Sequence, residues 1–495
     1  MKRLIVIVFI IFGAFLTLCL YRTYAYDTSV VEEVPSTTDL EYTFKIGNSS
    51  IKQITVDSGE TKYYDIVLGN PNNAKISYSV YYEMVSPSTK PDGYSIVYTS
   101  KSTGNSTGIV NNNGNITLNI VVTNTSSSAV TVKVGTVAGY VKGGELTLGS
   151  GQVIIPNAPV NAVELITKLN DGTTGDDGSG VYKVTHSAIP ASSSATGTEI
   201  PAVTDYRYYG PSPNNYICLD MEGGSTCPDK HLYRIIGSIY EEKENTNRLK
   251  LIKATPLTNG TTKGFSWDYK VNNGNGSYDN IWATITNGNY SNSLTSGSTL
   301  MQLLNSGAWW NGTSGSYYND STTATTVNFT NYKLSDKAKS YITTSRYYLG
   351  GYYESSRVVT NQFYAYERGT LRYNTDRPLY WDGMVGLMYP SDYGYAAGNT
   401  CVTGTYLYNY SRCKDKDWLL MTTSSDYTNA YEWLMSPYSG YSAGVFGVHY
   451  TGYVLDYNYD SNHVLSMRPV FYLSSSASIS DGDGSLDNPY LITLE

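Results

Sequence analysis

The chain has few charged residues and few histidines, and both shortages exclude classes of function. Asp, Glu, Lys and Arg make up 15% of the 495 residues, and the net charge is −8. Nucleic-acid-binding proteins present a basic patch or stripe, and this sequence has none, so no nucleic-acid partner is expected. The histidines are His186, His231, His449 and His463, and only the last two are close in sequence. No histidine cluster therefore argues for a metal.

Cysteine is also scarce. Cys19 lies in an apolar run, and the other four cysteines form two close pairs, Cys218 with Cys227 and Cys401 with Cys413. Zinc sites favour a Cys-x2–4-Cys spacing, and neither pair has it. We therefore predict two short loops, each closed by a disulfide, as an oxidising compartment permits. Free thiols are the alternative.

The one long apolar run is at the N-terminus. Lys2 and Arg3 precede an apolar stretch over residues 4–20, and Arg22 follows it. As a helix this stretch spans about 25 Å at ~1.5 Å per residue, slightly short of the ~30 Å hydrocarbon core. We predict that residues 1–25 are a retained membrane anchor with the bulk of the chain outside. Cleavage near Ala25 as a signal peptide, which would give a secreted protein, is the alternative.

The roughly 470 remaining residues exceed the ~250–300 at which a single core stops growing, so two domains are expected. Residues 39–166 contain apolar side chains at alternate positions, separated by Asn/Gly/Pro turns, as in Ile76, Tyr78, Val80 and Tyr82. This period of two predicts an antiparallel β-sandwich. Turns at 59–61 and 124–127 resemble those of immunoglobulin-like stalk domains of secreted bacterial proteins, which implies a spacer. Residues 167–205, rich in Gly, Ser, Thr and Asp, are predicted to be a linker.

Residues 206–495 are expected to form the second domain. Strands are predicted over residues 232–237 and 249–253, paired across the turn at 241–247. Helices are predicted over residues 298–305 and 335–342, the latter with Ser335 as N-cap. Mixed strands and short helices predict an α+β domain in a chain that is mainly β.

The end of the chain carries the most informative motifs. They are Trp433-Leu434-Met435-Ser436-Pro437, Ser466-Met467-Arg468-Pro469-Val470, Asp481-Gly482-Asp483-Gly484-Ser485 and Asp487-Asn488-Pro489-Tyr490. Their arrangement resembles the end of a family of secreted Gram-positive bacterial domains related to the C-type-lectin-like fold of formylglycine-generating enzymes. That resemblance implies a platform for variable loops, and so favours binding over catalysis. The catalytic relatives use a cysteine pair with a metal. The cysteines here are assigned to local pairs, so no metal and no cofactor are expected.

Tyrosine outnumbers phenylalanine by 50 to 9, and six of the tyrosines lie between residues 438 and 463 among Ser, Gly, Asp, Asn, His, Thr and Val. Tyr, Ser, Gly and Asn are typical of binding loops, since Tyr supplies rigid area with a polar end. We predict contact with a surface ligand, a glycan or a protein. Packing of the same rings on the domain's own helices is the alternative. The predicted contact residues are Tyr438, Tyr441, Phe446, Tyr450, Tyr453, Tyr457 and Tyr459.

Two other functions stay open at this stage. The same tyrosine-rich faces would also suit a structural surface or appendage subunit, and a lectin-fold enzyme is the third alternative. No catalytic residues are predicted, because Ser436 before Pro437 does not form a nucleophile elbow. Asp481, Asp483, Ser485 and Asp487 stand at alternate positions. No bidentate Glu follows at the spacing that calcium loops use, so no high-affinity calcium site is expected.

Overall fold

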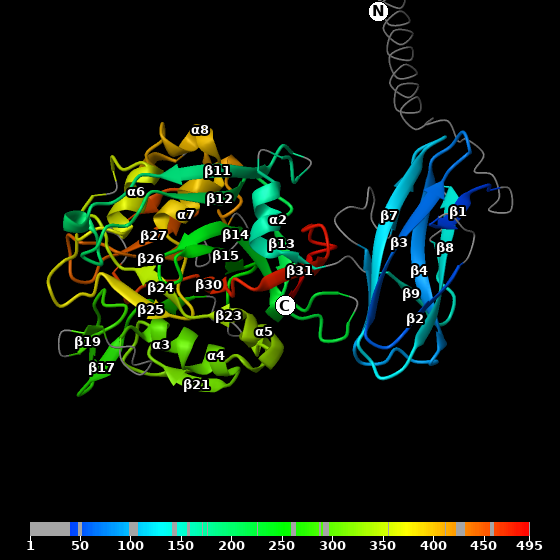
Figure 1. Ribbon diagram of the computed structural model, residues 1–495. Coiled ribbons are helices and arrows are strands. Elements are labelled where there is room, and N and C mark those ends of the chain that lie inside the picture. The colour runs from blue at the N-terminus through cyan, green and yellow to red at the C-terminus, as the bar shows by residue number, and fades with distance from the viewer. Residues whose placement is uncertain are drawn as a thin grey trace, which may run out of the picture. The chain divides into compact units, whose positions relative to one another are not determined.

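The computed structural model describes residues 40–494 with internal gaps, and the chain divides into two compact units, residues 1–158 and 159–495 (Figure 1). The gaps are residues 48–51, 99–106, 141–145, 156–158, 171, 176, 225, 259–263, 287–288, 291–296, 355, 411, 422–430 and 456–459. The predicted anchor at residues 1–25 lies outside the described residues. Among the described residues, no helix is long and apolar enough to cross a membrane.

The first unit consists of two antiparallel sheets. One has the order β1-β3-β7-β5, and the other has the order β2-β8-β4-β6 with β9 added against β4. The strand bounds are β1 Thr43–Ile46, β2 Gln53–Val56, β3 Glu60–Gly69, β4 Ile76–Ser86, β5 Tyr94–Tyr98, β6 Thr107–Val110, β7 Asn115–Asn124, β8 Val130–Tyr140 and β9 Gln152–Ile154.

Alternating side chains of both sheets fill one apolar core in this unit. Ile76, Tyr78, Val80 and Tyr82 are all buried on one face of β4. This result confirms the period of two predicted from the sequence, because successive side chains of a strand point to opposite faces. The first unit is therefore a two-sheet β structure.

The second unit is built on one large, mainly antiparallel sheet. Its order is β10-β31-β32-β13-β14-β15-β30-β23, with β12 added against β14 and β11 against β12. The only parallel pair among the described strands of this sheet joins β13 to β32. The strand bounds are β10 Val160–Asn161, β11 Gly180–His186, β12 Val203–Tyr209, β13 Tyr216–Cys218, β14 Leu232–Glu241, β15 Thr246–Lys253, β23 Ile342–Thr343, β30 Val470–Leu473, β31 Ala477–Asp481 and β32 Tyr490–Leu494.

Small two- and three-stranded sheets surround the large one. They pair β16 with β29, β17 with β18, β19 with β20, β21 with β22, β24 with β25, and β27 with both β26 and β28. The strand bounds are β16 Phe265–Ser266, β17 Lys270–Asn272, β18 Asn275–Ser277, β19 Ile285–Thr286, β20 Asn289–Tyr290, β21 Ser314–Tyr317, β22 Thr325–Asn328, β24 Ser345–Tyr348, β25 Tyr380–Gly383, β26 Tyr431–Pro437, β27 Val445–His449, β28 Val454–Leu455 and β29 Val464–Leu465.

The α-helices of the second unit are short. They are α2 Ala162–Lys168, α3 Thr299–Asn305, α4 Ala308–Asn311, α5 Asp336–Tyr341, α6 Thr360–Glu367, α7 Pro390–Ala396 and α8 Asn399–Val402. Both predicted helices are confirmed as α3 and α5. The Ser298 side chain accepts a hydrogen bond from Met301 N, and Ser335 accepts one from Ala338 N, so each serine caps its helix. The predicted hairpin is also confirmed, as β14 paired with β15.

Residues 167–205 belong to the second unit and do not form a linker. Within this segment β11 pairs along its whole length with β12, which begins at Val203. Ile189, Ala195 and Ile200 lie in the main apolar core. The Gly- and Ser-rich composition reflects tight turns around these buried positions. The domain boundary thus falls near residue 158 and not near 205.

The two predicted disulfides are present. Cys218 bonds to Cys227, and Cys401 bonds to Cys413. Each bond closes a short loop within the second unit. Because structural disulfides persist in oxidising compartments, they indicate an extracellular environment for this unit.

Candidate functional site

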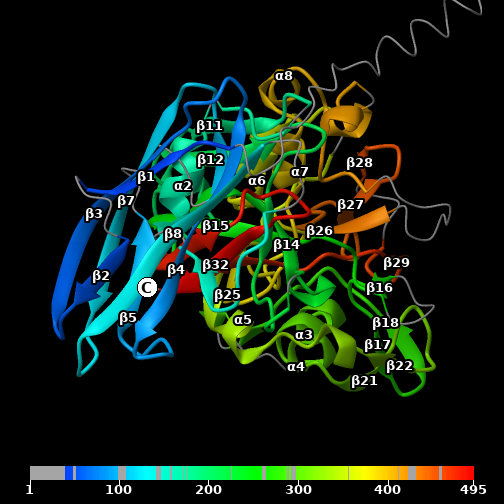
Figure 2. The ribbon, with the colours of Figure 1, turned by 90° about the vertical axis from the view of Figure 1, so that its right-hand side faces the viewer.

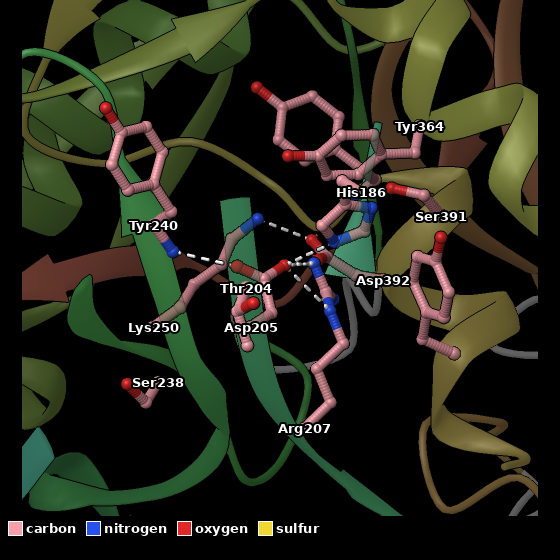
Figure 3. Close-up of polar contacts among 12 residues, drawn as sticks. His186, Thr204, Asp205, Arg207, Ser238, Tyr240, Lys250, Tyr364, Ser391 and Asp392 are labelled. Carbon is pink, nitrogen blue, oxygen red and sulfur yellow. Dashed lines mark hydrogen bonds and ion pairs between the residues drawn. The ribbon is translucent and has the colours of Figure 1, made fainter. Parts of the chain in front are cut away.

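Charged side chains of β11, β12, β15 and α7 meet in the interior of the second unit (Figure 3). Arg207 Nη2 lies 2.8 Å from Asp205 Oδ2, and Arg207 Nη1 lies 2.9 Å from Asp392 Oδ1. The Lys250 ammonium pairs with the other oxygen of Asp392. His186 Nε2 lies 2.8 Å from Asp205 Oδ2. These five side chains form one connected network, which we call the buried charge cluster.

The buried charge cluster has the residue types of an active site but no access for a substrate. Its side chains are all less than 5% exposed. Tyr364 stacks on the His186 ring, with centroids 3.5 Å apart. Burial lowers the pKa of His186. Burial would raise the pKa of Asp205, but Arg207 and then His186 outweigh it and hold that pKa below its usual range. The cluster is therefore an internal ion-pair network whose charges are satisfied by one another.

The predicted binding segment, residues 438–463, is held at both ends by packing residues that contact each other. Glu432 receives two hydrogen bonds from Arg468, at 2.6 and 2.7 Å. Arg468 also donates to the carbonyl of Leu419 at 2.6 Å. The Trp433 ring is buried, and its indole N–H donates to Phe265 O at 2.7 Å. The residues that precede and follow the segment are therefore bonded to each other in the core.

Within the segment, the predicted contact residues fall in different environments. Tyr441 is 45% exposed and Tyr450 is 44% exposed. Tyr438 is half-buried, and its hydroxyl donates to Tyr353 O at 2.7 Å. Tyr453 is half-buried and packs against the core. The predicted Tyr457 and Tyr459 lie outside the described residues.

Phe446 is a correction to the predicted contact set. Its side chain is 0% exposed, and its ring meets Phe363 edge-on at 5.4 Å between centroids. Tyr438 packs on it in the same way at 6.0 Å. Since Phe446 lies in β27, between two other strands of its sheet, its ring belongs to the core and offers no surface to a ligand.

The two exposed tyrosines lie at opposite ends of β27. This strand has 5 residues, and at ~3.3 Å per residue it spans about 16 Å. Tyr450 groups with His449, whose ring centroid is 4.2 Å away, and with Tyr431 at 5.9 Å. Tyr441 instead lies near Tyr278. The segment therefore presents two aromatic groups instead of one.

Tyr441 adjoins a hairpin that the sequence analysis did not identify. Strands β17 and β18 pair around Asn273 and Gly274, which have φ values of 51° and 79°, as a two-residue Asn-Gly turn requires. Tyr269 and Tyr278 flank this hairpin, with nearly parallel rings 6.4 Å apart. Partial burial raises the pKa of Tyr278, and the nearby Asp460, Tyr441 and Asp320 add to that shift. We call Tyr269, Tyr278 and Tyr441 the tyrosine face.

Strand β29 directly follows the predicted binding segment and pairs with β16. Figure 2 shows this pair near the β17–β18 hairpin. Backbone hydrogen bonds join these parts. Asp268 N donates to Ser461 O at 2.9 Å, and Asn280 N donates to Ser442 O at 2.9 Å. The residues before and after the hairpin are therefore tied directly to the predicted binding segment.

A buried amide fixes the loop that carries Tyr441. Asn280 is 1% exposed, and its Nδ2 lies 2.9 Å from Tyr438 O, 3.0 Å from Tyr441 O and 2.9 Å from Gly444 O. Arg377 Nε donates to Asn280 Oδ1 at 2.8 Å, and Arg377 Nη2 donates to Ser442 O at 2.9 Å. This arrangement holds the loop in one conformation before any ligand binds.

A cavity of about 310 Å³ opens beside the tyrosine face. Its walls come from the start of the β17–β18 hairpin, from α3 and from the end of β21. Tyr269 N donates to Thr299 Oγ1 at 3.0 Å, which joins two of these walls. The lining residues are Tyr269, Lys270, Val271, Thr299, Gln302, Ser316, Tyr317 and Tyr318.

Asp268 lies behind this cavity with its side chain fully buried. It accepts a hydrogen bond from Thr299 N at 2.9 Å and pairs with Lys270 Nζ at 3.2 Å. Burial raises the pKa of Asp268 to about 6, Lys270 opposes the shift, and Asp279 adds to it. The ion pair that positions Lys270 at the cavity therefore forms fully only above about pH 6.

We expect Asp268 to make the protein less stable as the pH rises from 4 to 7. Its folded pKa of about 6 is above its unfolded value, so its contribution is fully present below the unfolded pKa and is lost as the pH rises through 6. The slope is at most about 1.4 kcal/mol per pH unit. Urea unfolding at pH 4, 5, 6 and 7 measures it. Asp268→Asn should remove this component, and parallel profiles for the two proteins would contradict the assignment.

Three further groups of acidic or serine residues have the composition of a metal or catalytic site. Asp220, Glu222 and His231 each bring one ligand atom within 4.8 Å of the others, as a metal site would require. The protein's own side chains already engage both carboxylates. Lys230 Nζ lies 2.8 Å from Glu222, and Ser335 Oγ donates to Asp220 at 2.6 Å. This grouping is an ion-pair cluster near the Cys218–Cys227 loop.

The acidic turn near the C-terminus uses its carboxylates locally. Asp481 Oδ1 accepts a hydrogen bond from Gly482 N at 2.7 Å, and Asp483 Oδ1 accepts one from Ser485 N at 2.9 Å. Ser485 Oγ in turn accepts a hydrogen bond from Asn488 N at 3.1 Å. The oxygens at alternate positions thus shape the connection between β31 and β32.

Residues 440–444, Gly-Tyr-Ser-Ala-Gly, match the letters of a Gly-x-Ser-x-Gly elbow, a match that the sequence analysis overlooked. A nucleophile elbow turns from a strand into a helix. Here the pentapeptide connects β26 to β27, which pair with each other as antiparallel strands. The backbone around Ser442 is fixed by Asn280 and Arg377. The context is that of a hairpin loop and not of a catalytic serine.

Comparisons of the chain with protein-family profiles, with curated proteins and with solved structures found no match.

Proposed function

We propose that the protein is a non-catalytic binding protein, anchored in the cell membrane by residues 1–25 and exposed on the surface of a Gram-positive-type bacterium. The second unit would then be the C-type-lectin-like domain suggested by the C-terminal motifs. The first unit would be an immunoglobulin-like stalk. The two disulfides support an extracellular location.

The observation that carries this proposal is the tyrosine face on a rigid support. Tyr278 and Tyr441 are 39% and 45% exposed, and Asn280 fixes the backbone of the loop that bears Tyr441. A contact surface that is ordered before binding loses less conformational freedom on association. Tyr also buries a large area for few rotatable bonds. The partner would be a glycan or a protein at another surface, held by contact alone.

Replacing Tyr278 and Tyr441 together by serine is expected to weaken attachment by about 30-fold or more, since truncating a hot-spot ring costs ~2 kcal/mol. The substitutions should leave Tm within about 3 °C, because exposed positions contribute little to stability. Binding of the full-length protein to a glycan array and to plates coated with collagen or fibronectin measures attachment. Thermal unfolding measures Tm.

Tyr63→Ser is the matched control. Tyr63 lies in β3 of the first unit and is 75% exposed, so its loss should change neither attachment nor Tm. Attachment that survives the double substitution would contradict the proposal. The proposal would also be contradicted if the wild-type protein bound neither the glycan array nor the coated plates. Concentration-dependent polymers in place of binding would favour the structural-subunit alternative.

A further inference from the structure

We propose that the cavity beside the tyrosine face binds a single neutral sugar ring. This inference rests on the proposed function and names the ligand class of the same surface. The cavity volume, about 310 Å³, is at the lower end of the ~300–1,000 Å³ that small-molecule sites span. That size suits a single sugar ring better than an extended chain.

The aromatic walls suit the apolar side of a sugar. Tyr269, Tyr317 and Tyr318 all line the cavity and are only half-buried. A pyranose ring has C–H groups on its faces and hydroxyls at its edge, so an aromatic ring can pack on the face while polar groups bond to the edge. Tyr317 is held in place because its hydroxyl accepts a hydrogen bond from Ala308 N at 2.8 Å.

The remaining wall supplies polar groups in fixed positions. Gln302 Nε2 donates to Gly297 O at 3.0 Å, which orients the amide. Thr299 Oγ1 is fixed by the backbone of Tyr269. Lys270 Nζ is fixed by Asp268. Amide, hydroxyl and ammonium groups are the types that hydrogen-bond sugar hydroxyls, and a few such groups in an aromatic cavity are typical of a small-molecule site.

The charges around the cavity favour a neutral sugar over an acidic one. The one cation in its lining, Lys270, is already paired with Asp268. Asp279 lies close enough to Asp268 to raise its pKa, and Asp320 and Asp460 act in the same way on Tyr278. An anionic sugar would find no unpaired cation in the lining, and the neighbouring carboxylates of Asp268 and Asp279 would repel it.

The position of the Tyr269 ring also depends on a glycine in the other strand of the hairpin. A Cβ at Gly276 in β18 would overlap the Tyr269 hydroxyl. The hairpin therefore leaves room for this ring by having glycine at that position. Gly276→Ala should displace the ring without removing it.

Saturation-transfer NMR of the full-length protein with glucose, galactose, mannose and N-acetylglucosamine tests the proposal. Glucuronic acid and N-acetylneuraminic acid are the charged comparisons. We expect at least one neutral sugar to bind and the charged sugars to bind more weakly. Tyr318→Ala and Gly276→Ala should each weaken that binding by about tenfold, whereas Tyr63→Ala should not change it. Retention on a neutral galactomannan, compared with a desialylated glycoprotein, shows whether the sugar comes from a polysaccharide or a glycoprotein.

The proposal is overturned if no neutral sugar binds, if charged sugars bind more tightly, or if binding persists in both cavity variants. The Tm of each variant must match that of the wild type, and Tyr269→Ala, which removes the same ring, replaces Gly276→Ala should the latter unfold the hairpin. A surface attachment that still depends on Tyr278 and Tyr441 would show that the proposed function holds and that only the sugar assignment is wrong. If neither sugar binding nor attachment through Tyr278 and Tyr441 is found, the proposed function is wrong as well.

Discussion

Replacing Asp392 by alanine is expected to lower the free energy of unfolding of the second unit by about 3–5 kcal/mol, the cost of breaking a buried ion pair. Asp392 pairs with both Arg207 and Lys250, and it also accepts a hydrogen bond from Tyr389 N at 3.0 Å. Without it, Lys250 loses its carboxylate and Arg207 keeps only Asp205. Burial of an ammonium group without a counter-charge is what makes the change costly.

Tryptophan fluorescence during urea unfolding measures this effect on the second unit alone, because all seven tryptophans lie after residue 158. Glu164→Ala is the matched control. Glu164 pairs with Lys168 at 2.7 Å on α2, but both side chains are more than 55% exposed, so its removal should cost less than about 0.5 kcal/mol. An Asp392→Ala midpoint close to that of Glu164→Ala would show that the cluster adds nothing to stability.

Local features of this fold could be predicted from the sequence because neighbouring residues determine them. Ser298 and Ser335 cap the two helices that were expected. The alternation of apolar residues in β4 predicts which face of that strand is buried. The 9- and 12-residue separations of the cysteine pairs give the disulfides. In each case the signal and the structure lie within a few residues of each other.

Long-range features could not be predicted in the same way. His186 and Asp205 fall in a segment whose composition indicates a linker, and they are buried only because β12 pairs with β14 and α7 covers it. Arg207 joins them to Asp392, which lies 187 residues after Asp205, and Asp392 pairs in turn with Lys250, which lies 64 residues after His186. No local pattern connects them. Composition alone therefore placed the domain boundary too late.

The candidate site was predicted in part for a similar reason. The segment from Tyr438 onward does contain exposed rings, but β27 runs through it and separates Tyr441 from Tyr450. Burial of Phe446 follows from its central position in a three-stranded sheet. Tyr269 and Tyr278 could have been found from Asn273-Gly274, the strongest short-range hairpin signal. Their closeness to Tyr441 depends on tertiary contacts that the sequence does not show.

The second large effect is expected at Asn280, whose replacement by alanine should lower the free energy of unfolding by about 3 kcal/mol. That value is the upper end of the ~1–3 kcal/mol for buried polar groups left without partners. The carbonyls of Tyr438, Tyr441 and Gly444 would lose their shared donor, and Arg377 would lose an acceptor. Attachment should weaken as well, because Tyr441 would no longer be fixed. Urea unfolding and the plate assay measure the two effects.

Asn280→Asp separates the two roles of this side chain. The carboxylate still accepts the hydrogen bond from Arg377, and the pair gains a charge, but it has no N–H to donate to the three carbonyls. If the amide donors hold the loop, Asn280→Asp will be about as unstable as Asn280→Ala, and attachment will fall in both. Near-wild-type stability of Asn280→Asp would instead show that its bond to Arg377 is the important one. In that case the amide would not be what orders the tyrosine face.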